Sequence, residues 1–138
     1  MSKLQHEETH APKNQIPITA SSSVYEGRFI EWGGFIISFE KWLEELDETD
    51  LLSSLPDGRC PCPHWGFLFK GKMIVRYKDH EETITAGEAY YLKPGHVSLI
   101  AKGTESMEVS PKREYEEAMA VIIQKHSGDA SSNVTNAF

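Results

Sequence analysis

Strand-length apolar segments separated by turns fill the middle of this 138-residue chain. From residue 64 onward, the turns fall at Gly71, at a charged tip that contains Asp79 and His80, and at Gly87 and Gly95. Short strands bounded by turn residues are typical of an antiparallel sandwich or barrel. The pattern therefore predicts an all-β fold for the middle of the chain.

The same alternation predicts the individual strands. Apolar stretches on either side of Gly33 and Gly34 predict a first antiparallel pair at residues 24–32 and 35–42. Residues 45–55 predict a short helical turn that ends before the turn sequence Pro56-Asp57-Gly58. The remaining strands are expected at residues 64–70, 72–78, 81–85, 88–93, 97–101 and 104–110.

After Pro111 the period of the apolar residues changes to that of a helix. Apolar side chains recur at helical spacing at Tyr115, Ala118, Met119, Ile122 and Ile123. This spacing predicts a helix from about residue 112 to 126. Ser110 before Pro111 suits a helix N-cap. We expect the apolar face of this helix to pack on the outside of the barrel.

Gly87 and Gly95 enclose a segment that resembles the second sequence motif of the cupin family. The motif's proline is displaced by one position to Pro94, and Ser98 holds the place of its histidine. The stretch Cys-Pro-His-Trp-Gly also resembles small single-domain bacterial cupins for which no activity is established. The resemblance covers about residues 24–111. It implies an antiparallel jelly-roll β-barrel with a site inside it and a tendency to form dimers.

The first cupin motif departs from the family pattern at its metal ligands. Counted back from the motif's closing glycine, the glutamate position holds His64. The second histidine position falls on Cys60 or Arg59, and the first falls on Gly58 or Asp57. The resemblance therefore implies the barrel scaffold without the family's usual set of three histidines and one glutamate.

Length and composition limit the organisation and the partners of the chain. The length suits one domain, with a flexible arm at residues 1–20, the cupin domain at 21–127 and a flexible tail at 128–138. The net charge of −7 argues against nucleic-acid binding. No apolar stretch approaches the roughly 20 residues that span a bilayer. Because the N-terminus also lacks the apolar core of a secretory signal, a cytoplasmic location is expected.

Strand alternation predicts which side chains face the barrel interior, because successive residues point to opposite faces. Placing His64 at the inward position of the motif's glutamate also turns Leu68 inward. An apolar cavity with a few polar groups is the usual composition of a small-molecule site, and a barrel filled by side chains looks the same. The predicted ligand-binding residues are His64, Tyr77, Tyr91, His96 and Ser98.

A first candidate metal site is the cluster Cys60, Cys62 and His64, because zinc and iron accept thiolate and imidazole ligands. In an extended strand these positions share one face but lie about 6.5 Å apart, which is too far for one tetrahedral ion without a bend. Pro61 and Pro63 favour the other interpretation, an extended edge with half-buried cysteines.

A second candidate combines His64 and His96 with Glu108 in a two-histidine, one-carboxylate pattern. Strand alternation around Glu108, with Met107 and Val109 apolar, predicts instead that this carboxylate faces water. The alternative for His64 is a hydrogen bond to a backbone group or to Tyr91. His80 is expected to be a solvated turn residue.

The sequence leaves two functions open. The first is a non-catalytic module that binds a small, partly apolar molecule, which the loss of the metal set favours. The second is a metal-dependent enzyme using zinc or iron, whose atypical ligand set is drawn from Cys60, Cys62, His64, His96 and Glu108.

An outward apolar stripe predicts self-association. Trp65, Phe67 and Phe69 share the strand face opposite to His64, and Trp32 and Trp42 add aromatic surface in the first strand pair. An apolar stripe of this size needs a cover, and one short helix is too small to supply it. We therefore expect a homodimer.

Overall fold

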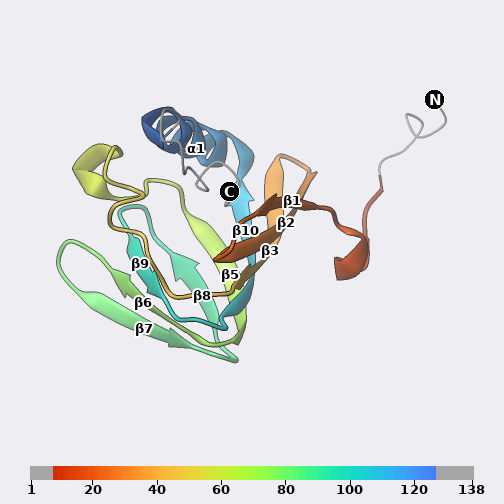
Figure 1. Cartoon of the computed structure of the whole chain (residues 1–138). Coiled ribbons are helices and arrows are strands. Elements are labelled where there is room, and N and C mark those ends of the chain that lie inside the picture. The colour runs from red at the N-terminus through yellow and green to blue at the C-terminus, as the bar shows by residue number, and fades with distance from the viewer. Residues whose placement is uncertain (1–7, 127–138) are drawn as a thin grey trace.

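Two antiparallel sheets and a C-terminal helix make up residues 8–126, the part of the chain that this computed structural model describes (Figure 1). The larger sheet has the strand order β1 (Ile18–Ser21), β2 (Tyr25–Trp32), β3 (Phe35–Trp42), β10 (Glu105–Pro111), β5 (His64–Lys70) and β8 (Ala89–Leu92). The smaller sheet has the order β4 (Leu46–Asp47), β9 (Val97–Ile100), β6 (Lys72–Arg76) and β7 (Glu81–Thr85). The tail predicted at residues 128–138 lies outside the described residues, as do residues 1–7 of the predicted arm.

The chain crosses between the sheets at Gly71, so that the consecutive strands β5 and β6 lie in different sheets. Gly71 has a φ of +85°, a conformation that favours glycine, and Thr104 packs where a Cβ atom would stand. The all-β jelly roll with a C-terminal helix is confirmed. The predicted closed barrel is not confirmed, because within residues 8–126 no strand pair joins the edges of the two sheets.

The boundaries of the eight predicted strands agree with the structure to within one or two residues, and α1 (Lys112–His126) occupies the predicted helix. Strands β1 and β4 were not predicted. Residues 48–54 form hydrogen-bonded turns, and the 3₁₀ turn η3 (Pro56–Gly58) follows them. Residues 13–20 differ from the flexible arm expected there. They form the 3₁₀ turn η2 (Lys13–Gln15) and β1, which pairs with β2 and buries Ile16 and Ala20.

Inward-facing apolar residues of both sheets make the main core. Leu68 of β5 and Met73 and Val75 of β6 are almost fully buried, as strand alternation predicts. The predicted inward position of Tyr91 is wrong, because the β5–β8 register pairs Tyr91 with the outward Trp65. Tyr90 faces inward instead, where Gly66 leaves room for its ring.

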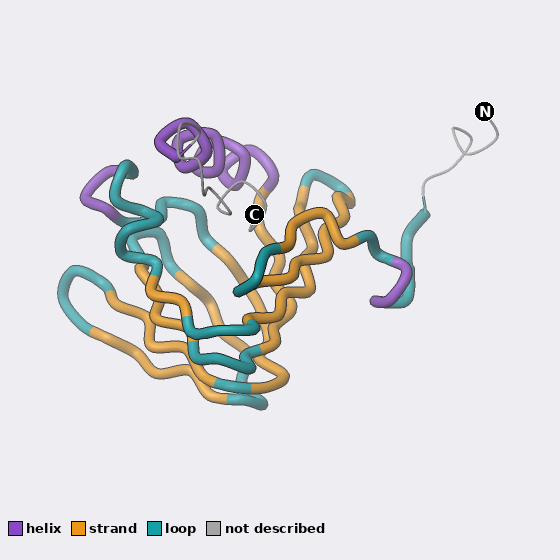
Figure 2. The backbone as a smooth tube through the Cα atoms, in the orientation of Figure 1, coloured by secondary structure: helices purple, strands orange, loops and turns teal. Residues whose placement is uncertain are grey.

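Helix α1 covers one end of the two sheets (Figure 2). Its buried residues Ala118, Met119 and Ile122 pack on a second apolar cluster that includes Leu52 and Cys62. The helix therefore closes the end of the space between the sheets. The sequence had predicted that it packs on the outside of the barrel. Among the residues that the structure describes, no helix combines the length and the apolar character needed to cross a membrane.

Candidate metal and ligand site

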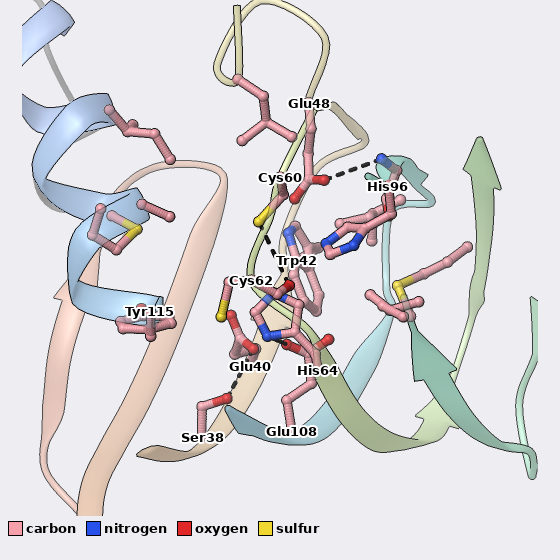
Figure 3. Close-up of a pocket in the computed structure, with 18 residues that line it drawn as sticks. Ser38, Glu40, Trp42, Glu48, Cys60, Cys62, His64, His96, Glu108 and Tyr115 are labelled. Atoms are coloured by element: carbon pink, nitrogen blue, oxygen red, sulfur yellow. Dashed lines mark hydrogen bonds and ion pairs between the residues drawn. The ribbon is translucent and has the colours of Figure 1, made fainter. Parts of the chain in front are cut away.

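A cavity of about 70 Å³ lies between the two sheets beneath α1 (Figure 3). Its apolar walls come from both sheets, the turn at residues 48–54 and the helix: Leu52, Met73, Leu92, Ile100, Ala118, Met119 and Ile122. The polar and titratable side chains on its surface are Ser38, Glu40, Trp42, Glu48, Cys60, Cys62, His64, His96, Ser98, Glu108 and Tyr115. An apolar cavity with converging polar groups is the usual form of a small-molecule site.

Three side chains from two parts of the chain meet in this cavity. One ligand atom each of Cys60, His64 and His96 lies within 4.8 Å of the other two. Cys60 and His96 are held together by a β-bridge, in which the Cys60 N–H donates to the His96 carbonyl over 3.0 Å. The chain then bends at Cys62, between two prolines, and returns His64 to the same point at the start of β5. This bend brings together residues that an extended strand would hold apart.

Cys62 also lines the cavity but is not part of this cluster. Its thiol lies 3.5 Å from the carbonyl oxygen of Pro63, and only 1% of the residue is exposed. The cluster that the structure assembles is therefore Cys60, His64 and His96, and not the predicted Cys60, Cys62 and His64.

Both imidazoles are held through Nδ1. The Nδ1–H of His96 donates to the Lys93 carbonyl oxygen over 2.8 Å, and Nδ1 of His64 lies 2.6 Å from the Ser110 hydroxyl and 3.7 Å from Glu108 Oε1. Ser110 thus belongs to β10 and contacts His64, and does not act as the predicted helix N-cap. The carbonyl partner fixes the tautomer of His96 with its proton on Nδ1, and in both rings a partner at Nδ1 leaves Nε2 as the ligand.

Burial sets the protonation of the cluster. Burial lowers the pKa of His64 to about 4. Burial and repulsion from the neighbouring His64 ring also lower the pKa of His96 to about 4. Both imidazoles are therefore neutral at pH 7 and free to bind a cation. Burial raises the pKa of the Cys60 thiol to about 12, so this group becomes a thiolate only when a cation replaces its proton.

Glu108 lies inside the cavity, so the expectation that it faces water is wrong. Along β10 the inward set is Ser106, Glu108 and Ser110, while Met107 and Val109 face outward. The predicted alternation along β10 was correct, but the polar side chains face the cavity and the apolar ones face outward. In most strands the apolar side chains face the interior. Burial raises the pKa of Glu108, and hydrogen bonds from Tyr90, at 2.7 Å, and from Glu40 oppose this shift.

Glu40 and Glu48 are two further carboxyl groups on the cavity surface that the sequence did not reveal. Burial and the neighbouring Glu108 carboxylate raise the pKa of Glu40 to about 8, although Tyr25 and Ser38 donate hydrogen bonds to it. Burial raises the pKa of Glu48 to about 8, against the hydrogen bond from the Ser98 N–H at 3.1 Å. The signal that could have revealed Glu40 was its position two residues before Trp42 in β3, because such residues share one face of a strand.

The predicted ligand-binding residues divide into two groups. His64, His96 and Ser98 line the cavity. Tyr77 lies on the outer hairpin, where its hydroxyl accepts the Lys93 N–H at 3.1 Å and its ring stacks on His80. Tyr91 is 48% exposed and stacks on Trp65. His80 is a surface turn residue, as expected, and lies between the carboxylates of Asp79 and Glu82.

Several solved structures share this arrangement of two antiparallel sheets. An RmlC-like cupin from Shewanella frigidimarina is 15% identical, with a TM-score of 0.55 over 79% of this chain and 96% of that one. KdgF from a Halomonas species is 8% identical, with a TM-score of 0.53 over 79% and 98% of the two chains. Fe(II) HppE is 11% identical, with a TM-score of 0.53 over 75% of this chain and 60% of that one.

This chain has the cupin fold. At these identities the likeness to solved structures concerns the fold and no activity. No protein-family model matches the sequence, and no curated protein is similar enough to match it. Within the cupin fold, the cavity between the sheets carries the cluster Cys60, His64 and His96 in place of the three histidines and one glutamate of the family pattern.

Proposed function

We propose that this cupin-fold chain is a metal-dependent enzyme that binds zinc or iron(II) at Cys60, His64 and His96 and a small molecule beside the metal. The observation that carries the proposal is the convergence of these three side chains, whose ligand atoms lie within 4.8 Å of one another. Cys60 is held to His96 by a β-bridge, His64 begins β5, and His96 directly precedes β9. Their meeting is therefore a property of the fold and not of one local sequence motif.

The donor set fits a divalent metal of borderline softness. One thiol and two imidazoles suit zinc and iron(II), and HppE, which has the same fold, is named with Fe(II). In tetrahedral zinc sites the ligand atoms lie about 3.4 to 3.8 Å apart, so these side chains need to approach by about 1 Å. The imidazoles are neutral and need to lose no proton, whereas Cys60 releases one on binding.

The neighbouring residues suit proton handling beside such a centre. A divalent ion bound there would act as a Lewis acid on a substrate oxygen or a water molecule. Glu40 and Glu108 hydrogen-bond each other, which requires that the pair holds a proton. Since Glu108 Oε1 lies 3.7 Å from Nδ1 of His64, the pair is placed to give or accept a proton at the edge of the cluster. The apolar walls and α1 limit the access of water.

A metal-free module for a small molecule is the second candidate. The observation that favours it is the burial of Cys60 in the apolar cluster beneath α1, where a neutral thiol is stable without a cation. In this case His64 and His96 contribute polar contacts to the bound molecule as neutral imidazoles.

Elemental analysis of protein purified without a polyhistidine tag separates the two candidates. We expect about one zinc or iron per wild-type chain, retained through gel filtration, and a loss of metal in His64→Ala and in His96→Ala. His80→Ala is the matched control, because His80 lies on the surface between two carboxylates. Wild-type protein that takes up no stoichiometric metal after incubation with zinc(II) or iron(II) would reject the enzyme proposal and leave the metal-free module.

A further inference from the structure

Three buried hydrogen-bonding groups in the cavity have no partner among the described residues. They are Nε1 of Trp42, Oγ of Ser98 and the hydroxyl oxygen of Tyr115. Trp42 and Ser98 are 3% and 2% exposed, and the three residues come from β3, β9 and α1. Figure 3 shows the Trp42 indole among the labelled side chains that converge on the cavity. An unpaired buried polar group is costly, so three of them around one cavity point to a bound molecule.

The Trp42 indole nitrogen restricts the chemistry of that molecule. An indole N–H only donates hydrogen bonds, so its partner must supply an acceptor. The hydroxyl groups of Ser98 and Tyr115 are also able to donate. A carbonyl or hydroxyl oxygen therefore matches this part of the cavity, and a purely hydrocarbon ligand would leave the groups unpaired.

The charge of the lining disfavours an anionic ligand in the metal-free cavity. No lysine or arginine lines the cavity, whereas Glu40, Glu48 and Glu108 do. Without a metal ion, a carboxylate or phosphate ligand would enter this apolar space with no cationic partner, which is strongly unfavourable. Met73, Ile100 and Ile122 instead offer contacts to an apolar body.

We propose that the substrate is a small uncharged molecule with a carbonyl or hydroxyl oxygen on an apolar body, and that Trp42, Ser98 and Tyr115 supply the hydrogen bonds to its polar atoms. The inference uses the site of the proposed function and names the class of molecule that binds there. It requires no particular metal, because none of the three residues belongs to the cluster Cys60, His64 and His96.

The signal of the Trp42 indole N–H in a proton–nitrogen correlation spectrum tests this proposal. Trp42→Phe assigns the signal by its disappearance, while Trp32 and Trp65 provide reference signals from outside the cavity lining. The probes are 2-butanone, butyrate and butylammonium, which share a four-carbon body and differ in charge. We expect 2-butanone to shift the Trp42 signal saturably, with an affinity at least about tenfold above that for either ion.

Tyr115→Phe provides a variant that keeps the fold, because it removes a hydroxyl group with no partner in the protein. It should weaken 2-butanone binding by about tenfold or less and leave the free protein at least as stable. Trp65→Phe on the outer face is the control and should change neither property. A Trp42 signal that does not respond to 2-butanone, or that responds equally or better to butyrate or butylammonium, would overturn the proposal.

The same titrations on zinc-loaded and chelator-treated protein separate this inference from the metal proposal. Binding of 2-butanone without any metal uptake rejects the metal centre and keeps the neutral-ligand site. Metal uptake with a silent Trp42 signal in both forms rejects the neutral-ligand site and keeps the metal centre.

Discussion

Ser110 is the residue through which β10 holds the ring of His64. Its hydroxyl lies 2.6 Å from Nδ1, and the pairing of β10 with β5 keeps the two residues close. Hydrogen-bond partners of a ligand histidine orient its ring, and their loss lowers metal affinity by roughly 10- to 100-fold.

We expect Ser110→Ala to lower zinc affinity within this range, measured by competition with a chromophoric chelator. Ser106→Ala is the matched control, because Ser106 shares the inward face of β10 with Ser110 but does not line the cavity. Equal zinc affinity in both variants would contradict the role of Ser110.

Glu48 makes the stability of the fold depend on pH. Burial raises the pKa of this carboxyl group from the ordinary value of 4.5 to about 8. Between these values the folded state binds more protons than the unfolded state, so the free energy of unfolding falls as the pH rises. The contribution of Glu48 is complete below pH 4.5 and is lost as the pH passes about 8.

We therefore expect Glu48→Gln to weaken the decline in stability between pH 5 and pH 8, because glutamine keeps an acceptor for the Ser98 N–H and does not titrate. Urea denaturation of chelator-treated protein at several pH values measures the effect. Glu45→Gln, at an exposed position nearby, serves as the control. If wild type and Glu48→Gln lose stability in parallel, the carboxyl group is not protonated in the fold.

At the scale of elements, α1 closes the cavity and contributes to its apolar wall. Met119 is 9% exposed and packs in the apolar cluster beneath the helix. We expect Met119→Ala to lower the free energy of unfolding by about 2 to 5 kcal/mol, as for other large-to-small substitutions in a core. Val121→Ala on the exposed side of α1 should change the free energy of unfolding by only about 0.5 kcal/mol or less.

Urea denaturation measures both variants. A cost for Met119→Ala no larger than that for Val121→Ala would show that the helix is not packed on the cavity in solution.

The element boundaries could be predicted from the sequence because glycines and prolines mark them. Gly71 stands where the chain changes sheets, and the apolar period changes after Pro111. The orientation of some strands could not be predicted. In β8, Tyr90 and Tyr91 are equally apolar, so only the register with β5 decides which faces inward.

For the site, the cupin resemblance placed His64 and Ser98 correctly in the cavity, because it fixed which face of their strands points inward. It did not identify Glu40 or Glu48, whose carboxyl groups look like those of surface residues in the sequence. The approach of Cys60 to His96 depends on a long-range β-bridge, and the approach of His64 to Cys60 depends on a bend at Cys62. The long-range β-bridge leaves no local sequence pattern.

At the scale of the whole molecule, an aromatic face remains exposed on the outer side of the larger sheet. Trp65, Phe69 and Tyr91 are 42%, 48% and 48% exposed, and Trp65 stacks on Tyr91 with ring centroids 5.3 Å apart. Trp42, which the sequence analysis assigned to this exposed set, is buried in the core. The homodimer stays a prediction, and it now depends on Trp65, Phe69 and Tyr91.

Light scattering at micromolar concentration should give twice the chain mass of 15.6 kDa. A Trp65→Ser, Phe69→Ser double variant should give the monomer mass, because it removes most of the exposed aromatic area. A wild-type protein that is monomeric and remains in solution would contradict the prediction.

Cobalt(II) substitution tests the metal centre most directly, because a cysteine thiolate bound to cobalt gives a charge-transfer band in the near ultraviolet. Cys60 and Cys62 are both buried free thiols that line the cavity, but only Cys60 belongs to the cluster with His64 and His96. The predicted result is a band at one cobalt per chain in wild type and in Cys62→Ser, and its loss in Cys60→Ser. A wild-type protein without the band, or a band that survives Cys60→Ser and disappears in Cys62→Ser, would contradict the metal site at Cys60, His64 and His96.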